Sequence, residues 1–203
     1  MKSFSLVILS FCFLKSFSQT SFDIRSLTYD KWKASCKYLN VKCDTFFYAN
    51  KTDPETIECV IESLDKSTVY KQFDKPTKQL KIDSIIFSHN EVEEIKRQMI
   101  LYKDSNWTRN LFPNSHVLNR NQIDDFIKRV DKSKLTLEEK LSKNVFTFSQ
   151  PIFLRKNSIC IITIEEDSIL EKSGGTWIYV HKSGSWIKYA PLCLDIGINN
   201  KKL

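Results

Sequence analysis

Three histidines, His89, His116 and His181, are the residues best suited to acid–base or metal chemistry in this sequence. They lie far apart, and none belongs to an H-E-x-x-H or H-x-x-x-H pattern, which places two zinc ligands on one helix face. No Gly-x-Ser-x-Gly sequence is present either, the turn that carries the nucleophile of many hydrolases. Local motifs therefore predict no catalytic residue and no metal site.

Carboxylates occur in three clusters, at positions 93–94, 124–125 and 165–167. Adjacent residues on a helix point in different directions, so the first two clusters are not acid–base dyads. The third follows an apolar strand and lacks the alternating acids of a calcium loop, so we interpret it as a solvated loop. All four glycines lie after residue 173, which excludes the glycine-rich turns that bind nucleotide phosphates. We predict no cofactor.

A C-terminal hairpin is the best candidate for a binding surface. Ser183-Gly184 predicts a two-residue turn, which pairs Tyr179 with Lys188, Val180 with Ile187, His181 with Trp186, and Ile178 with Tyr189. Alternation then places one set of aromatic and polar side chains on a single face: Trp177, Tyr179, His181, Trp186 and Lys188. Such a face is typical of a glycan- or peptide-binding platform. The favoured alternative is that helices cover it and its aromatic rings form a second core layer.

Helical patterns dominate the N-terminal half of the chain. Asp53-Pro54-Glu55 is a strong helix start, with a capping acid and proline in the first turn. Ser88 and Glu91 form a capping box before a second apolar stripe. Apolar residues at helical spacing predict four helices, over residues 27–39, 54–64, 88–102 and 123–130. Thr136 and Glu139 indicate one more short helical turn.

Strand patterns follow from Val145 onward. β-Branched and aromatic residues predict strands over 146–153, 158–164, 176–181 and 185–189, with an earlier short strand at 80–87. Residues 103–121 are polar and turn-prone. We therefore predict an α+β fold, in which N-terminal helices pack on a C-terminal antiparallel sheet of three to five strands. Residues 19–203 are expected to form a single domain.

Residues 1–18 are interpreted as a secretory signal peptide. Lys2 precedes a nine-residue stretch from Leu6 to Leu14 that is apolar except for Ser10, and small residues precede a cleavage site near Ser18. The alternative is a buried N-terminal helix. No later segment is long and apolar enough to span a membrane. We expect a protein exported to the periplasm or the extracellular space.

Five cysteines follow the signal peptide, and an oxidising compartment permits disulfides between them. The spacing favours a bridge from Cys36 to Cys43 or Cys59, and another from Cys160 to Cys193. An odd number leaves at least one thiol outside any intrachain bridge. The alternative is that all five are small buried apolar residues.

The charge is basic but mixed, with 31 Lys and Arg against 24 Asp and Glu, a net charge of +7. Lysine greatly outnumbers arginine, whereas nucleic-acid recognition relies on arginine forks, so we expect no nucleic-acid partner. Together these features predict a non-enzymatic envelope or extracellular binding protein whose partner is a glycan, a peptide or another protein. The alternative is a hydrolase whose site is assembled from scattered residues.

A pattern over residues 80–190 resembles a loose group of small exported bacterial proteins. It consists of a Ser-x-Pro/Val-x-Phe start, an apolar strand, a Gly-rich bend, an aromatic strand and a Lys-x-Gly-x-Trp hairpin. The matching residues are Ser149, Pro151, Phe153, Gly174, Gly175, Tyr179, Lys182, Gly184, Trp186 and Lys188. The segment IIFSHNEVEEIKRQMILYKDSNW, ending at Trp107, is similar to their middle part. The Cys-Gly-Gly-x-Cys-Gly bend of many members has no cysteines here. The resemblance implies export and supplies no activity.

Overall fold

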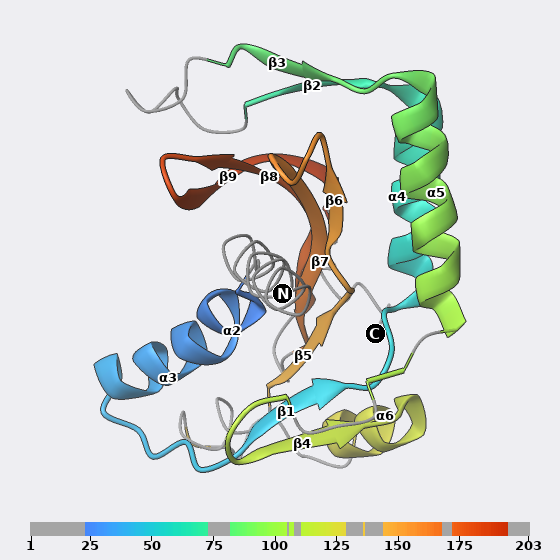
Figure 1. The fold of residues 1–203 in the computed structure, drawn as a ribbon. Coiled ribbons are helices and arrows are strands. Elements are labelled where there is room, and N and C mark those ends of the chain that lie inside the picture. Colours follow the sequence, from blue (N-terminus) through green and yellow to red (C-terminus); the bar gives the residue numbers. More distant parts are fainter. Residues whose placement is uncertain are drawn as a thin grey trace, which may run out of the picture.

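The computed structural model describes residues 23–72, 82–104, 106–107, 111–128, 136, 144–167 and 172–194. In that part the chain is α+β, with one large curved sheet, helices on both of its faces and a separate two-stranded ribbon (Figure 1). The proposed signal peptide lies outside the described residues, as do part of the predicted 80–87 strand and most of the turn near Thr136.

The large sheet has seven strands and is mixed. Its path runs through β4 (Ser115–Leu118), β1 (Phe46–Ala49), β5 (Val145–Phe148), β7 (Ile159–Asp167), β8 (Lys172–Lys182) and β9 (Ser185–Leu194). β6 (Ile152–Leu154) also pairs with β7. β4, β1 and β5 are parallel, and the remaining pairs are antiparallel. The predicted α+β class is confirmed, but the sheet is larger than the predicted three to five strands and is mixed, not purely antiparallel.

The two parallel strands that sequence patterns missed are short. β1 and β4 have four residues each, too few for a clear alternating pattern. β4 falls in the segment predicted to be only turn-prone. The predicted strand over 146–153 is two strands, because the chain bends at Ser149–Pro151 and continues as β6. Proline cannot donate a ladder hydrogen bond, which suits this interruption.

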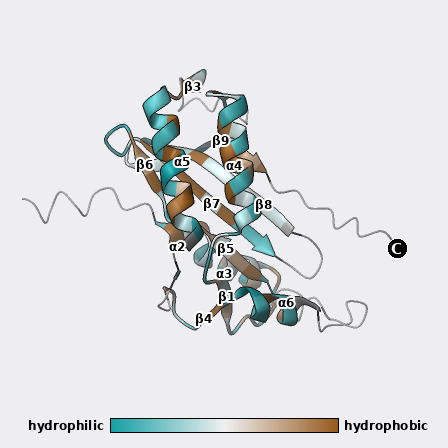
Figure 2. Cartoon of the chain, turned by 90° about the vertical axis from the view of Figure 1, so that its right-hand side faces the viewer, coloured by the Kyte–Doolittle hydropathy of each residue, from teal (hydrophilic) through white to brown (hydrophobic). Residues whose placement is uncertain are grey.

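One face of the sheet is covered by α4 (Pro54–Lys66) and α5 (His89–Asp104), which lie side by side across β7 and β8 (Figure 2). Both predicted starts are confirmed. The Asp53 carboxylate accepts a hydrogen bond from the Glu55 amide, and Ser88 and Glu91 form the reciprocal capping box. The apolar stripes of both helices pack against the inner residues of the sheet in the largest core cluster.

The opposite face carries α2 (Ile24–Leu27) and α3 (Tyr29–Tyr38). α3 corresponds to the helix predicted at 27–39, whereas α2 precedes it and was not predicted. An aromatic cluster lies beneath α3 at the parallel end of the sheet: Tyr29, Trp32, Phe46, Tyr48, Phe112, Phe146 and Phe148. No helix among the described residues combines the length and the apolar character that a membrane crossing requires.

The fold contains one short-range and one long-range disulfide. Cys36 bonds with Cys43 after α3, one of the two predicted partners. Cys59 of α4 bonds with Cys193 of β9, and Cys160 is a buried free thiol. The predicted bridge between Cys160 and Cys193 was therefore wrong. Cys160 faces α2 within one core cluster, whereas Cys193 lies in the cluster under α4.

A narrow ribbon of β2 (Val69–Lys71) and β3 (Ser84–Ile86) follows α4 and precedes α5. The Tyr189 hydroxyl donates to main-chain oxygens of Tyr70 and Ile82, at 3.5 and 3.4 Å, and so ties β9 to this ribbon. Among the described residues the last helix is α6 (Arg120–Lys128), which directly follows β4 and corresponds to the one predicted at 123–130, of which residues 129–130 lie outside the described part.

Candidate functional site

The hairpin of β8 and β9 forms as predicted at its turn. Ser183 and Gly184 both have positive φ, at 51° and 79°, the geometry of a tight hairpin turn. The pairs of Tyr179 with Lys188 and His181 with Trp186 are confirmed. A bulge then shifts the register, so Ile178 pairs with Ala190 and the predicted pairing with Tyr189 was wrong. Extra residues at such bulges cannot be located from alternation alone.

The candidate face of this hairpin is largely filled from within the protein. Trp177 and Tyr179 are 9% and 5% exposed and pack with Cys160, next to the partly buried Leu27 of α2. Burial raises the pKa of Tyr179 to about 12. The Lys188 ammonium lies 3.3 Å from the centroid of the Trp177 ring, so a cation already occupies that ring face.

Trp186 and His181 are half-buried, and their ring centroids are 4.9 Å apart. Phe153 of β6 contacts the other end of Trp186, with centroids 5.9 Å apart. These contacts leave only part of the predicted platform accessible. Ligand binding by this face therefore stays a prediction.

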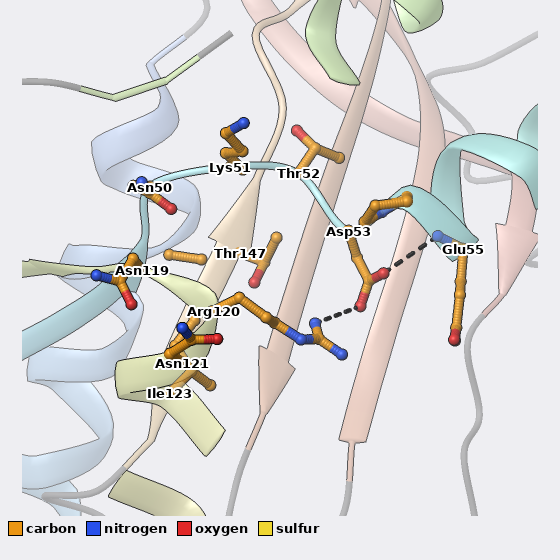
Figure 3. Close-up of a pocket in the computed structure, with 12 residues that line it drawn as sticks. Asn50, Lys51, Thr52, Asp53, Glu55, Asn119, Arg120, Asn121, Ile123 and Thr147 are labelled. Atoms are coloured by element: carbon orange, nitrogen blue, oxygen red, sulfur yellow. Dashed lines mark hydrogen bonds and ion pairs between the residues drawn. The ribbon is translucent and has the colours of Figure 1, made fainter. Parts of the chain in front are cut away.

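A second candidate site lies at the carboxyl ends of the parallel strands. A pocket of about 510 Å³ opens there. The loop from β1 into α4 forms one wall, the loop from β4 into α6 forms another, and Thr147 of β5 forms part of the floor (Figure 3). Open α/β sheets bind ligands in this position, because successive loops and helix starts converge at the carboxyl edge.

Main-chain hydrogen bonds fix both loops. The Asn50 amide donates to the Leu118 carbonyl, and the Asn50 carbonyl accepts from the Trp107 amide, both at 2.8 Å. On the other wall, Asn119 and Gln122 cap α6 reciprocally through their side chains and amides. The pocket walls are thus held by the ends of the sheet and by a helix cap.

An ion pair crosses the pocket between the two helix starts. Arg120 donates from Nη1 to Oδ2 of Asp53 at 3.0 Å, as Figure 3 shows. The Asp53 side chain is 6% exposed and that of Arg120 is 62% exposed. Burial acts to lower the pKa of Arg120, but Asp53, Asp124 and Asp167 outweigh it, so the pKa lies above its usual value.

Two buried threonines give the pocket its polar floor. Thr52 and Thr147 are each 4% exposed, and both line the pocket. Within the ranges that the structure describes, neither hydroxyl has a hydrogen-bond partner. Neither hydroxyl oxygen is among the buried atoms without a partner, so both are open to water or to a ligand in the pocket. These two hydroxyls therefore offer hydrogen bonds to a molecule in the pocket.

A second polar layer lies beside this floor. Glu165, the cross-strand neighbour of Thr147, is 1% exposed and accepts a hydrogen bond from the Thr56 hydroxyl of α4. Thr163 and Thr176 share a buried hydrogen bond of 2.7 Å. The interpretation of residues 165–167 as a solvated loop was therefore wrong, because β7 continues to Asp167 and buries Glu165 under α4.

The residues with obvious catalytic chemistry lie elsewhere. His89 and His116 are exposed, on α5 and β4, and no histidine lines either of the two pockets described here. Burial raises the pKa of the Cys160 thiol, which keeps it in its unreactive neutral form. Among the described residues, no cluster of three or more His, Cys, Asp or Glu side chains has the geometry of a metal site.

A further pocket of about 470 Å³ lies between α2–α3 and the sheet. The Asn144 amide donates to the Glu166 carboxylate at its edge. Trp32 and Phe146 form much of its apolar wall, and both belong to the aromatic core under α3. We interpret this space as a packing gap beside the short α2, and we regard the pocket between α4 and α6 as the main candidate site.

Sequence reasoning missed this main pocket. Asp53 was recognised, but only as a helix cap, and Arg120 lies 67 residues away from it. The usable signals were two polar runs, Asn50–Thr52 just before the cap of α4 and Asn119–Asn121 at the start of α6. Only the parallel pairing of β1 with β4 reveals that these two runs face each other.

Comparisons of this chain with protein-family models, with curated proteins and with solved structures found no match. The functional argument therefore depends on the geometry of the site.

Proposed function

We propose that this chain is an exported, non-enzymatic binding protein that holds a small polar ligand in the pocket between the starts of α4 and α6. The observation that carries the proposal is the preformed pocket with Thr147 on its floor, whose hydroxyl has no hydrogen-bond partner among the described residues and stays open to the pocket. A ligand in the pocket can hydrogen-bond to this hydroxyl in place of water.

The walls support the same function. Asparagine side chains at positions 50, 119 and 121 offer both donors and acceptors at the rim. Few, well-placed polar groups around a preformed cavity are typical of small-molecule sites, whose volumes run from about 300 to 1,000 Å³. The pocket of about 510 Å³ falls within that range.

The pocket favours binding over hydrolysis. Among its described lining residues there is no histidine, cysteine or serine, and its buried carboxylate, Asp53, already bonds with Arg120 and the Glu55 amide. A hydrolase needs a nucleophile or activated water within reach of a base. Export is supported by the predicted signal peptide and by two disulfides, which persist in oxidising compartments.

The test is a ligand screen on the protein purified without residues 1–18. Neutral sugars, amino acids, dicarboxylates and phosphates are compared by the shift in melting temperature, and any positive compound is titrated by calorimetry. We expect one class to stabilise the wild type, because a ligand that binds only the native state raises its unfolding temperature.

Thr147→Val removes the floor hydroxyl with little change of shape, and Asn121→Ala removes one rim amide. Thr68→Val is the matched control, because Thr68 is exposed and lies outside both pockets. Both pocket variants should weaken binding while the control binds like the wild type. The proposal is wrong if no class stabilises the protein, or if the pocket variants bind as tightly as the control.

A further inference from the structure

The pocket lining carries equal numbers of positive and negative side chains. The lining contains two positive side chains, Lys51 and Arg120, and two negative ones, Asp53 and Glu55. Arg120 is bonded to Asp53, and its Nε lies 4.0 Å from Oδ1 of Asp124. The negative charge of Asp167 also acts on Arg120.

This balance disfavours a charged ligand of either sign. An anion near Arg120 would meet the carboxylates of Asp53 and Asp124 at close range. A cation would meet the Arg120 guanidinium and the positive ends of two helices. Either ligand would also give up water in a half-enclosed site, where it would meet as many charged side chains of its own sign as of the opposite sign. A neutral molecule avoids both penalties.

The hydrogen-bonding groups specify the neutral molecule further. Threonine hydroxyls and asparagine amides can both donate and accept hydrogen bonds. The lining has two threonines and three asparagines. A hydroxyl group on the ligand also donates and accepts, so an array of hydroxyls matches this lining at several points. Ala49, Pro54 and Ile123 supply a small apolar wall for the C–H face of such a molecule.

Resting on the proposed function, we infer that the ligand of this pocket is a neutral sugar of one or two rings. Its hydroxyls bond to Thr52 and Thr147 on the floor and to the asparagine amides at the rim. Its ring carbons lie against the apolar wall. The Asp53–Arg120 pair remains intact and contributes its outward-facing donors and acceptors.

The experiment compares sugars that share one ring and differ in charge. D-glucose, D-galactose and D-mannose are titrated by calorimetry beside the matching uronic acid and 2-amino sugar of each, and maltose tests the second ring. For the best hexose we expect binding at least tenfold tighter than for either charged form. Thr147→Val should weaken that binding about three- to tenfold, as the loss of one neutral hydrogen bond does, and Thr68→Val should leave it unchanged.

The outcomes separate this inference from the proposed function. If a uronic acid or amino sugar binds as tightly as the neutral hexose, the ligand class is wrong and the pocket is still a binding site. If no sugar binds but another class of compound in the wider screen does, the inference of a neutral sugar is wrong and the proposed binding function stands. If no compound of any class binds, both are wrong.

Discussion

The carboxylate that caps α4 is also the partner of the first residue of α6: Asp53 accepts from the Glu55 amide through Oδ1 and from Arg120 through Oδ2. One buried side chain thereby fixes the distance between two helix starts and the width of the pocket between them. A change at Asp53 should therefore alter both the stability of the fold and the shape of the pocket.

Removing the arginine should expose this coupling. Arg120→Ala removes the ion pair with the 6%-exposed Asp53 carboxylate, so we expect the free energy of unfolding to fall by about 1–3 kcal/mol. Asp53→Asn retains a good helix cap and buries no charge, so it should cost less than about 1 kcal/mol. Urea denaturation of both single variants and the double variant measures the coupling.

Arg97→Ala is the control for this cycle, because Arg97 pairs with Glu94 on the exposed face of α5, where solvent screens the ion pair and its contribution to stability is small. If Arg120→Ala lowers the free energy of unfolding no more than Arg97→Ala does, the ion pair between Arg120 and Asp53 does not stabilise the fold.

The sequence predictions were correct where a feature depends on neighbouring residues, and they failed where it depends on residues far apart in the chain. The start of α4 at Asp53 and the capping box at Ser88 depend on residues within one helical turn, and both are confirmed. The turn at Ser183-Gly184 is equally local. By contrast, β1 and β4 are defined by pairing across more than 60 residues, and nothing in either segment specifies that partner.

Buried polar residues were the other source of error. Three adjacent acids at 165–167 look solvated in a sequence, because burying a carboxylate is costly. Glu165 is nevertheless buried, since Thr56 of α4 supplies a hydrogen bond from 109 residues away. The pocket floor at Thr147 was missed for the same reason, because a threonine in a strand is ordinary until its environment is known.

The two disulfides should contribute very different amounts to stability. Cys59 and Cys193 are 134 residues apart, whereas Cys36 and Cys43 are 7 apart. In the loop-entropy model these separations correspond to about 5 and about 2 kcal/mol. Replacing both cysteines of each pair by alanine and measuring denaturation under oxidising conditions tests the difference. Equal losses would show that entropy of the unfolded chain does not set their contributions.

Stability should depend on pH through Glu91. The hydrogen bond from Arg155 is the main cause that lowers the Glu91 pKa from 4.5 to about 2. A carboxylate with a lowered pKa stabilises the fold above its unfolded pKa, and this contribution is lost as the pH falls toward 2. Wild type should therefore exceed Glu91→Gln in melting temperature at pH 7, with the gap closing between about pH 5 and pH 2.

Glu58→Gln is the control for Glu91, because Glu58 is exposed on α4 outside any described ion pair or hydrogen bond. Its melting temperature should follow the wild type at every pH. A constant gap between wild type and Glu91→Gln down to pH 2 would contradict the role given to the contact between Glu91 and Arg155.

The two tryptophans of the hairpin face should behave differently when truncated. Trp177 is 9% exposed and packs in the core cluster with Cys160 and Tyr179, so Trp177→Ala should cost about 3–5 kcal/mol in unfolding free energy. Trp186 is half-buried and has less apolar area to lose, so Trp186→Ala should cost about 1–2 kcal/mol.

The same variants decide between the hairpin face and the pocket as the binding site. If the pocket is the site, Trp186→Ala retains the sugar affinity of the wild type, and Trp177→Ala retains it wherever the variant is folded. Circular dichroism establishes the folded range, and calorimetry within it measures affinity. If Trp186→Ala instead abolishes binding on a glycan or peptide array and Thr147→Val does not, the partly exposed ring beside His181 is the anchor. The ligand would then bind on the curved sheet, because rigid aromatic rings lose little side-chain entropy on binding.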